Sequence, residues 1–107
     1  MGKRDERLRE YIRDISARLL NEQSNKTSLV TVTNVILAEN GKKATIFITV
    51  FPETKESEAL SFARRQRTEL RRKIIKELNI SHPPFIEIDI DRGEKNRQRI
   101  DELSRQQ

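Results

Sequence analysis

The stretch TKESEALSFARRQRTELRRKIIKELN, Thr54 to Asn79, combines the longest helical pattern of the chain with its densest positive charge. At about 100° per residue its apolar side chains fall on one face, as expected of a helix packed on a core. They are Ala59, Leu60, Ala63, Leu70, Ile74 and Leu78. The opposite half carries basic side chains, namely Arg64, Arg65, Arg71, Arg72 and Lys76. One helical stretch therefore has one side for the core and another side that attracts negative charge.

A charged helix face often does no more than keep a helix soluble, and that interpretation stays open here. In this stretch, however, the charges are segregated by sign. The acids Glu53, Glu56 and Glu58 crowd the first turn, where they suit the positive end of the helix dipole, and the bases take over from Arg64. We therefore favour an anion-binding surface over simple solvation.

The middle of the same stretch conflicts with a straight helix. Gln66 and Arg67 fall on the apolar side, between Ala63 and Leu70. A continuous helix would have to bury these two polar side chains. We therefore predict a break or bend between Ala63 and Arg67.

Length and composition predict one small domain over residues 1–107, large enough to bury about two-thirds of its unfolded surface. The chain is 34% hydrophobic and 36% charged, so we expect a modest core with flexible ends at residues 1–4 and 97–107. The absence of cysteine excludes disulfides and thiolate metal sites, and it fits a reducing cytoplasm.

The charge balance and the polar amino end narrow the possible partners. No apolar run approaches the roughly 20 residues that span a bilayer, so secretion and membrane insertion are not expected. The formal net charge of +5 favours an acidic partner. Nucleic acid is the first choice and an anionic membrane surface the second.

The flanking sequence predicts a helix over residues 5–22, with Asp5 as its cap, and a polar loop over residues 21–28. The other face of that helix mixes both charge signs, which favours a solvated face over a second binding surface. Two strands follow, residues 29–38 and 43–51, joined by a turn at Glu39-Asn40-Gly41.

In the second strand, Ala44, Ile46, Ile48 and Val50 share the inner face. Phe47 and Phe51 on the outer face predict that this face is at least partly covered. Stacking of these rings on bases is the less favoured alternative, because aromatic residues make up only 5% of the chain.

Residues 85–91 alternate cleanly between apolar and acidic side chains, which predicts a third strand. The outward carboxylates Glu87, Asp89 and Asp91 are typical of a solvated face, with a cation site the minor alternative. Asp91 and Glu94 have the spacing of a capping box, so a terminal helix is expected from about Glu94.

Catalytic groupings are not recognisable in the sequence. His82 is the single histidine, and it has no nucleophile or carboxylate partner at a recognisable spacing. An enzyme is therefore the weakest of the function classes considered, and no cofactor, metal or small-molecule substrate is implied.

Residues 29–35, LVTVTNV, and residues 44–50, ATIFITV, resemble the strand pair of the ribosome-binding factor A family. The helix from Glu58 through Ala63 to Leu70, the Pro84-Phe85 entry to the last strand and residues 99–103 are similar to later landmarks of that family. The resemblance implies an α+β, KH-like (type II) fold, with a three-stranded sheet, helices on one face, and the order α-β-β-α-β-α with a kinked or broken central helix.

The same resemblance implies a non-enzymatic, cytoplasmic and monomeric assembly factor. Such a factor binds the immature small ribosomal subunit through its ribosomal RNA and assists late maturation and processing of the RNA 5′ end. The chain departs from the family where Ala63 is followed by Arg64-Arg65 instead of glycine, and its loop ending Lys26-Thr27-Ser28 lacks the usual Asp-Pro. The general KH signature Gly-x-x-Gly is also absent, so ordinary KH reading of single-stranded bases is not supported.

We expect the basic residues of the central helix to contact RNA phosphates. The candidates are Arg64, Arg65, Arg71, Arg72 and Lys76, with Arg67 and Lys73 next. The alternative is a basic KH-like protein-interaction adaptor, without direct contact to ribosomal RNA, in which the same arginines pair with a partner's carboxylates.

Overall fold

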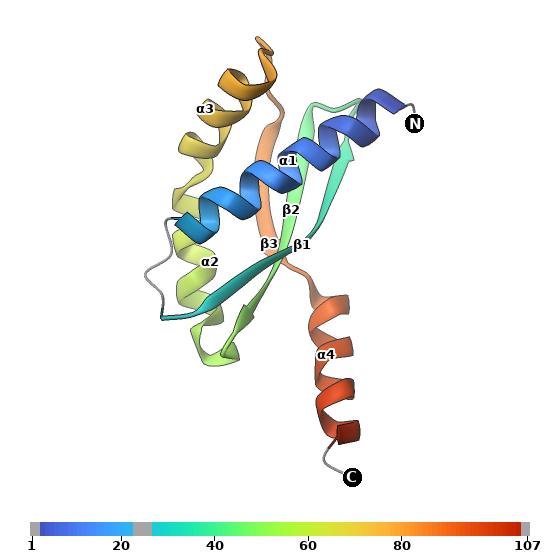
Figure 1. The fold of residues 1–107 in the computed structure, drawn as a ribbon, viewed down its shortest axis with the longest axis vertical. Coiled ribbons are helices and arrows are strands. Elements are labelled where there is room, and N and C mark those ends of the chain that lie inside the picture. The colour runs from blue at the N-terminus through green and yellow to red at the C-terminus, as the bar shows by residue number, and fades with distance from the viewer. Residues whose placement is uncertain (1–2, 23–26, 106–107) are drawn as a thin grey trace.

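A computed structural model describes residues 3–22 and 27–105 of the chain, and its elements follow the predicted order (Figure 1). They are α1 (Lys3–Glu22), β1 (Leu29–Ala38), β2 (Lys43–Phe51), the 3-10 turn η1 (Glu53–Lys55), α2 (Glu56–Arg65), α3 (Arg67–Leu78), β3 (Phe85–Ile90) and α4 (Arg92–Arg105). The predicted α+β class and the order α-β-β-α-β-α are confirmed, with the central helix broken into α2 and α3.

The sheet has the strand order β1-β2-β3, with β1 antiparallel and β3 parallel to β2. The β1–β2 turn follows the predicted Asn-Gly signal, since φ is +57° at Asn40 and +81° at Gly41, and Glu39 joins them at +55°. A parallel pair needs a long crossover, which α2 and α3 supply. A bulge shifts the β1–β2 register between Val32 and Asn34, which leaves Thr33 as the extra residue.

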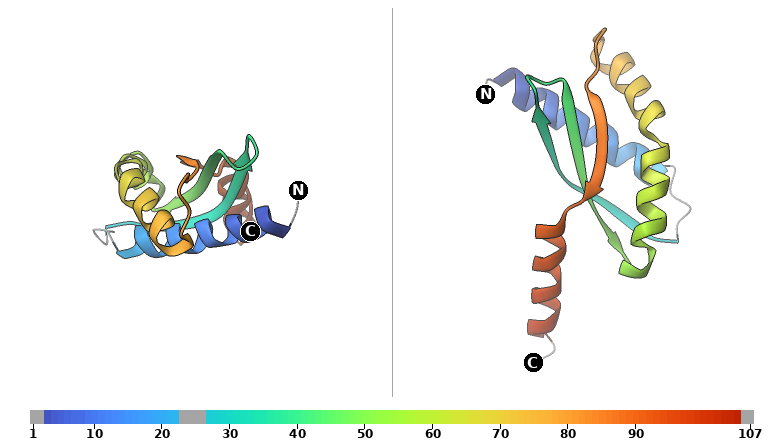
Figure 2. Two further views of the ribbon diagram at one scale, coloured as in Figure 1. Left: turned by 90° about the horizontal axis from the view of Figure 1, so that it is seen from above. Right: turned by 180° about the vertical axis from the view of Figure 1, so that it is seen from behind.

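The hydrophobic core lies between one face of the sheet and the three helices α1, α2 and α3, which all cover that face (Figures 1 and 2). Each strand sends alternate side chains into the core, as their period of two requires. The fully buried members are Ile12, Ile15, Leu19, Leu20, Val35, Ala44, Ile46, Ile48, Ala63, Leu70, Ile74, Ile86 and Ile88. The third strand predicted over residues 85–91 is present, and it buries Ile86, Ile88 and Ile90 in this core.

The break in the central helix lies at Gln66, inside the predicted interval. α2 ends at Arg65 and α3 begins at Arg67, while Gln66 has a ψ of 2° and its backbone N–H donates to the Ala63 carbonyl at 3.0 Å. Both neighbours of the break on the core side, Ala63 and Leu70, are buried. The break lets two apolar faces meet one core without burying the polar side chains between them.

The opposite face of the sheet is mostly open, as the view from behind shows (Figure 2). The predicted partial cover of this face holds in its middle, where Thr49 is buried and Phe47 is half-buried. It does not hold at the end of β2, where Phe51 is 73% exposed. Helix α4 leans over that end of the open face.

The two terminal helices begin earlier than predicted. α1 starts at Lys3, which places Asp5 in the first turn instead of at the cap. α4 starts at Arg92, and Asp91 caps it because its Oδ1 accepts the Glu94 backbone N–H at 3.0 Å. Residues 97–105 are therefore helical. The single domain over 1–107 and the flexible ends stay predictions, and residues 1, 2, 106 and 107 lie outside the described residues.

Candidate nucleic-acid interface

Helix α3 is fixed to the core by Leu70 and Ile74, which are 1% and 0% exposed. With 3.6 residues per turn, these anchors direct the other side of the helix toward solvent. Arg71, Arg72 and Lys76 are exposed on it, and Lys73 is half-buried. The predicted separation of a core side from a basic side is therefore present in α3.

Two of the predicted residues turn toward the free edge of β3. The Nε of Arg64 donates to the Ile88 carbonyl at 3.1 Å, and one of its terminal nitrogens lies 4.0 Å from an Asp89 oxygen. Arg67 donates to the Glu87 carboxylate at 2.9 Å and to the Arg64 carbonyl at 3.0 Å. These arginines occupy backbone and side-chain acceptors that an open strand edge would otherwise present to other chains.

The acidic side chains of β3 thus have a structural role that the sequence did not reveal. Glu87 and Asp89 were predicted to lie on a solvated face. Asp89 is exposed and Glu87 is half-buried, and both also pair with arginines from the α2–α3 junction. Asp91 accepts from the Thr33 hydroxyl at 2.6 Å and caps α4. Within residues 3–22 and 27–105 no three acidic, histidine or cysteine side chains form a group that could hold a metal ion.

The remaining predicted residues differ in how they are engaged. Arg72 pairs with Glu69 one turn earlier, at 2.9 Å, in an exposed contact of the kind that contributes little stability. Arg71, Lys73 and Lys76 form no ion pair with the part of the chain that the structure describes. Their charges are therefore available to a ligand.

Arg65 faces a different part of the surface from the α3 residues. It lines a small hollow of about 70 Å³ together with Lys55, Ser28 and Phe62. Lys55 pairs with Glu58 at 3.7 Å. The seven predicted residues are accordingly not one continuous patch, because the break at Gln66 changes the direction of the helix face between Arg65 and Arg71.

Two basic residues of α1 lie beside β1, on the helix face that was predicted to be solvated. Arg9 and Arg13 line a hollow of about 410 Å³ with Glu10 and with Asn34 of β1. Both charge signs are therefore present in this hollow. Near the other end of α1, Arg18 pairs with Glu77 of α3 at 3.0 Å, which ties the two helices together.

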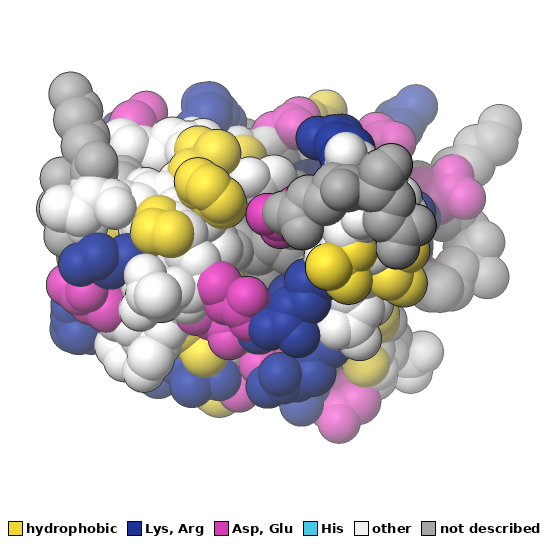
Figure 3. Space-filling model, turned by 90° about the horizontal axis from the view of Figure 1, so that it is seen from below, with side chains coloured by type: hydrophobic (Ala, Val, Ile, Leu, Met, Phe, Trp, Pro, Cys, Tyr) yellow, Lys and Arg dark blue, Asp and Glu magenta, His cyan; other side chains and the backbone are white. Residues whose placement is uncertain are grey.

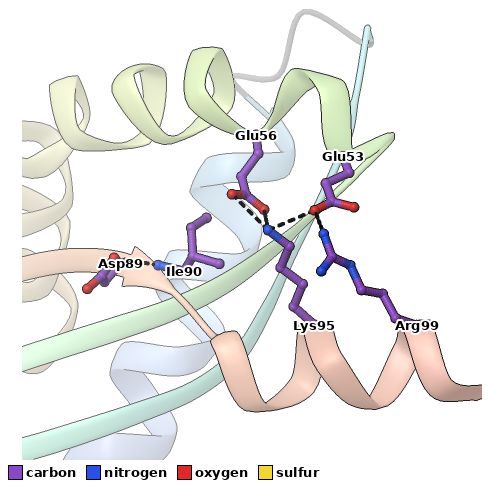
Figure 4. A network of polar contacts seen from close by, with 6 residues as sticks. All are labelled: Glu53, Glu56, Asp89, Ile90, Lys95 and Arg99. Carbon is purple, nitrogen blue, oxygen red and sulfur yellow. Dashed lines mark hydrogen bonds and ion pairs between the residues drawn. The ribbon is translucent and has the colours of Figure 1, made fainter.

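A separate charged network joins α4 to the start of the central helix (Figure 4). Lys95 Nζ lies 2.9 Å from carboxylate oxygens of both Glu53 and Glu56, and Arg99 also donates to Glu53. Hydrogen bonds from Lys95 and then Arg99 lower the pKa of the Glu53 carboxyl. The hydrogen bonds to Glu53 and then Glu56 raise the pKa of the Lys95 ammonium.

No helix among the described residues is both long and apolar enough to cross a membrane. His82 lies in an exposed loop, where its Nδ1 is 2.9 Å from the Ser81 hydroxyl. Neither observation adds a site to the basic surfaces described above.

A family model described as ribosome-binding factor A matches residues 3–104 of the chain. No curated protein sequence matches the chain. The family match covers all the helices and strands apart from the last residue of α4.

Solved structures share the fold at low sequence identity. The crystal structure of ribosome-binding factor A from Thermus thermophilus is 22% identical, with a TM-score of 0.72 over 85% of this chain and 97% of that one. A homology model of the Thermus thermophilus factor, fitted into a cryo-EM map of its complex with the 30S subunit, is 20% identical, with a TM-score of 0.67 over 78% and 91%. A solution NMR structure of a Thermotoga maritima protein is 22% identical, with a TM-score of 0.64 over 77% and 81%.

Proposed function

The chain belongs to the ribosome-binding factor A family, and from this we propose that it is a non-enzymatic assembly factor that binds the immature small ribosomal subunit. It contacts the ribosomal RNA of that subunit and assists late maturation, including processing of the RNA 5′ end. A fold shared with the Thermus thermophilus factor that was fitted into a 30S complex supports the choice of subunit.

The observation that carries the proposal is the exposed basic side of α3. Arg71, Lys73 and Lys76 are without ion pairs among the described residues, and Arg72 has only an exposed one. Cationic side chains held on a rigid helix neutralise RNA phosphates at fixed spacing. Helix-shaped RNA is recognised mainly through its backbone and shape, so a basic helix face suits it without any base-reading motif.

Arg64, Arg65 and Arg67 lie apart from the basic side of α3, and we propose that they add separate phosphate contacts. A guanidinium has five N–H donors, and Arg64 uses only some of them on the β3 edge. The free donors of Arg64 and Arg67 can bind phosphate while the others hold the junction in place. Arg65 adds its contact near the start of β1.

The proposed role needs no cofactor, metal, membrane or small-molecule substrate. It places the protein in the cytoplasm, acting as a monomer on a ribosomal particle. These properties follow from the assembly-factor role and are part of the proposal.

A salt titration of binding to purified immature small subunits tests the proposal. Replacing Arg71→Gln and Arg72→Gln together should weaken binding and flatten the log-salt slope by roughly one to two units, because each phosphate contact releases about one counterion. The control is Arg97→Gln with Arg105→Gln on α4, which removes the same charge elsewhere. An unchanged slope in the α3 variant, or an equal change in both variants, would remove α3 from the interface.

A second candidate is a basic adaptor that binds a protein partner without touching RNA. It is favoured by the pairs Arg67–Glu87 and Arg72–Glu69, because they show that these guanidinium groups already bind carboxylates with good geometry. In this case the α3 variant would not differ from the unchanged protein in RNA binding, and it would lose a specific protein complex.

A further inference from the structure

The end of the molecule opposite the β1–β2 turn carries a groove that the RNA-binding surface does not use. It has a volume of about 460 Å³ and lies between the open face of the sheet and helix α4. Figure 3 shows this end of the molecule, where hydrophobic side chains lie beside acidic and basic ones. The groove therefore offers both apolar and charged side chains to a ligand.

The floor of the groove is apolar and exposed. Leu29 and Phe51 are direct partners across β1 and β2, and they are 60% and 73% exposed. Thr31 and Thr49, the next pair on the same face of the sheet, continue the floor toward the middle of the sheet. A pair of large apolar side chains left open beside a groove is typical of a binding surface.

The wall of the groove is a polar face of α4. Gln98, Asp101, Glu102 and Arg105 line it at the spacing of one helix face. Asp101 and Glu102 form no ion pair with residues 3–22 or 27–105. Helical geometry places the apolar residues of α4, Ile100 and Leu103, on the side away from the groove. The sheet end therefore meets carboxylates instead of apolar cover.

The network at Lys95 closes one end of the groove. A smaller hollow of about 140 Å³ shares Thr49, Phe51, Gln98 and Glu102 with the groove and is also lined by Glu53 and Lys95. Lys95 and Arg99 are occupied by Glu53 and Glu56. These two bases therefore do not neutralise Asp101 and Glu102. Arg105 is the one basic residue of the wall, so the wall carries two carboxylates against one guanidinium.

We propose that this groove binds a basic peptide segment of a partner protein, with an apolar side chain seated on Leu29 and Phe51 and neighbouring Lys or Arg side chains paired with Asp101 and Glu102. Charge complementarity selects this occupant, because the carboxylates attract cations and repel the phosphates of RNA. The interaction is independent of the RNA contact proposed for α3. It gives the molecule two surfaces of opposite preference, one for RNA and one for a basic protein segment.

NMR titration of the 15N-labelled protein with the peptide Lys-Leu-Lys-Phe-Lys tests the proposal. Backbone signals of residues 29–31, 49–51 and 98–105 should shift, whereas Glu-Leu-Glu-Phe-Glu should leave them unchanged. Replacing Asp101→Asn and Glu102→Gln together should lower the affinity for the lysine peptide by about threefold to tenfold, as expected for two exposed ion pairs. The variant Phe51→Ala tests the floor, and its exposed position leaves folding intact.

The matched control is Glu6→Gln with Asp14→Asn, which changes the same charge on the exposed face of α1 and should leave peptide binding unchanged. Equal shifts with the acidic peptide would overturn the proposal, as would groove shifts caused by an oligouridylate. Concentration-dependent shifts of the groove signals without peptide would also overturn it, because they would assign the groove to a second copy of the chain.

Discussion

Helices α3 and α4 are similar in length and charge, yet they are attached to the protein in opposite ways. The 12-residue α3 is held by the buried side chains of Leu70 and Ile74. The 14-residue α4 has no buried residue and is held mainly by the ion pairs of Lys95 and Arg99. Two helices of similar charge are therefore held differently, α3 by the core and α4 by ion pairs at the surface. The RNA contact that we propose is on the helix held by the core, where the spacing of the basic side chains is fixed.

We expect the largest change in stability from a substitution that weakens the packing of α3 on the core. Replacing Ile74→Ala should lower the free energy of unfolding by about 2–5 kcal/mol, because it leaves a cavity in the core. The same substitution in α4, Ile100→Ala, should change it by less than about 0.5 kcal/mol, because Ile100 is 62% exposed. Urea unfolding measures the free-energy change of both variants, provided that the m-value stays unchanged. Equal losses would contradict the difference between the two helices.

We expect a smaller effect from a substitution that weakens the attachment of α4 alone. Replacing Lys95→Met removes both ion pairs to Glu53 and Glu56, so amide exchange across residues 92–105 should accelerate by about twofold to fivefold. Exchange in the buried strands should stay unchanged. The control is Lys73→Met on α3, which removes a lysine without an ion pair among the described residues and should leave exchange in α3 as it was. Faster exchange throughout the Lys95 variant would show that α4 supports the whole fold.

The smallest effect concerns pH. Because its pKa is lowered in the folded protein, Glu53 contributes to α4 attachment above the ordinary glutamate range, and this contribution is lost as pH falls through the lowered pKa. Lys95 has a raised pKa, so its contribution is present below the ordinary lysine range and is lost only as pH rises through that higher pKa. The attachment of α4 is therefore strongest at pH values between the lowered pKa of Glu53 and the raised pKa of Lys95.

Carboxyl titration by NMR measures this. Glu53 should titrate below the ordinary glutamate range in the unchanged protein, and its midpoint should rise in the Lys95→Met variant. A midpoint that does not move would mean that Lys95 is not the main partner of Glu53 in solution.

The sequence predicted those parts of the fold that depend on local periodicity. Both strands of the hairpin, Leu29–Ala38 and Lys43–Phe51, have the predicted bounds, and the helix break lies in the predicted interval. These features follow from alternation, turn residues and the apolar spacing on either side of Gln66. The apolar residues of α4 gave no guide to how this helix is held, because Ile100 and Leu103 are 62% and 60% exposed and do not anchor it.

The arrangement of the candidate site could not be predicted in the same way. The contacts of Arg64 and Arg67 with β3 depend on the crossover that brings residues of distant sequence together. For the same reason, the sequence did not predict the ion pair between Glu87 and Arg67 or the ion pair between Lys95 and Glu53. A helical projection gives the face of a side chain, and only the packed fold gives its partner.

Co-sedimentation of the tagged protein with ribosomal particles from lysate, at low and moderate salt, tests whether the protein binds immature small subunits through α3. The unchanged protein should travel with free or immature small subunits and not with translating ribosomes. The variant with Arg71→Gln and Arg72→Gln should shift toward the top of the gradient at moderate salt, while the variant with Arg97→Gln and Arg105→Gln should stay with the particles. If the unchanged protein remained at the top of the gradient at both salt concentrations, it would not be a factor that binds immature small subunits.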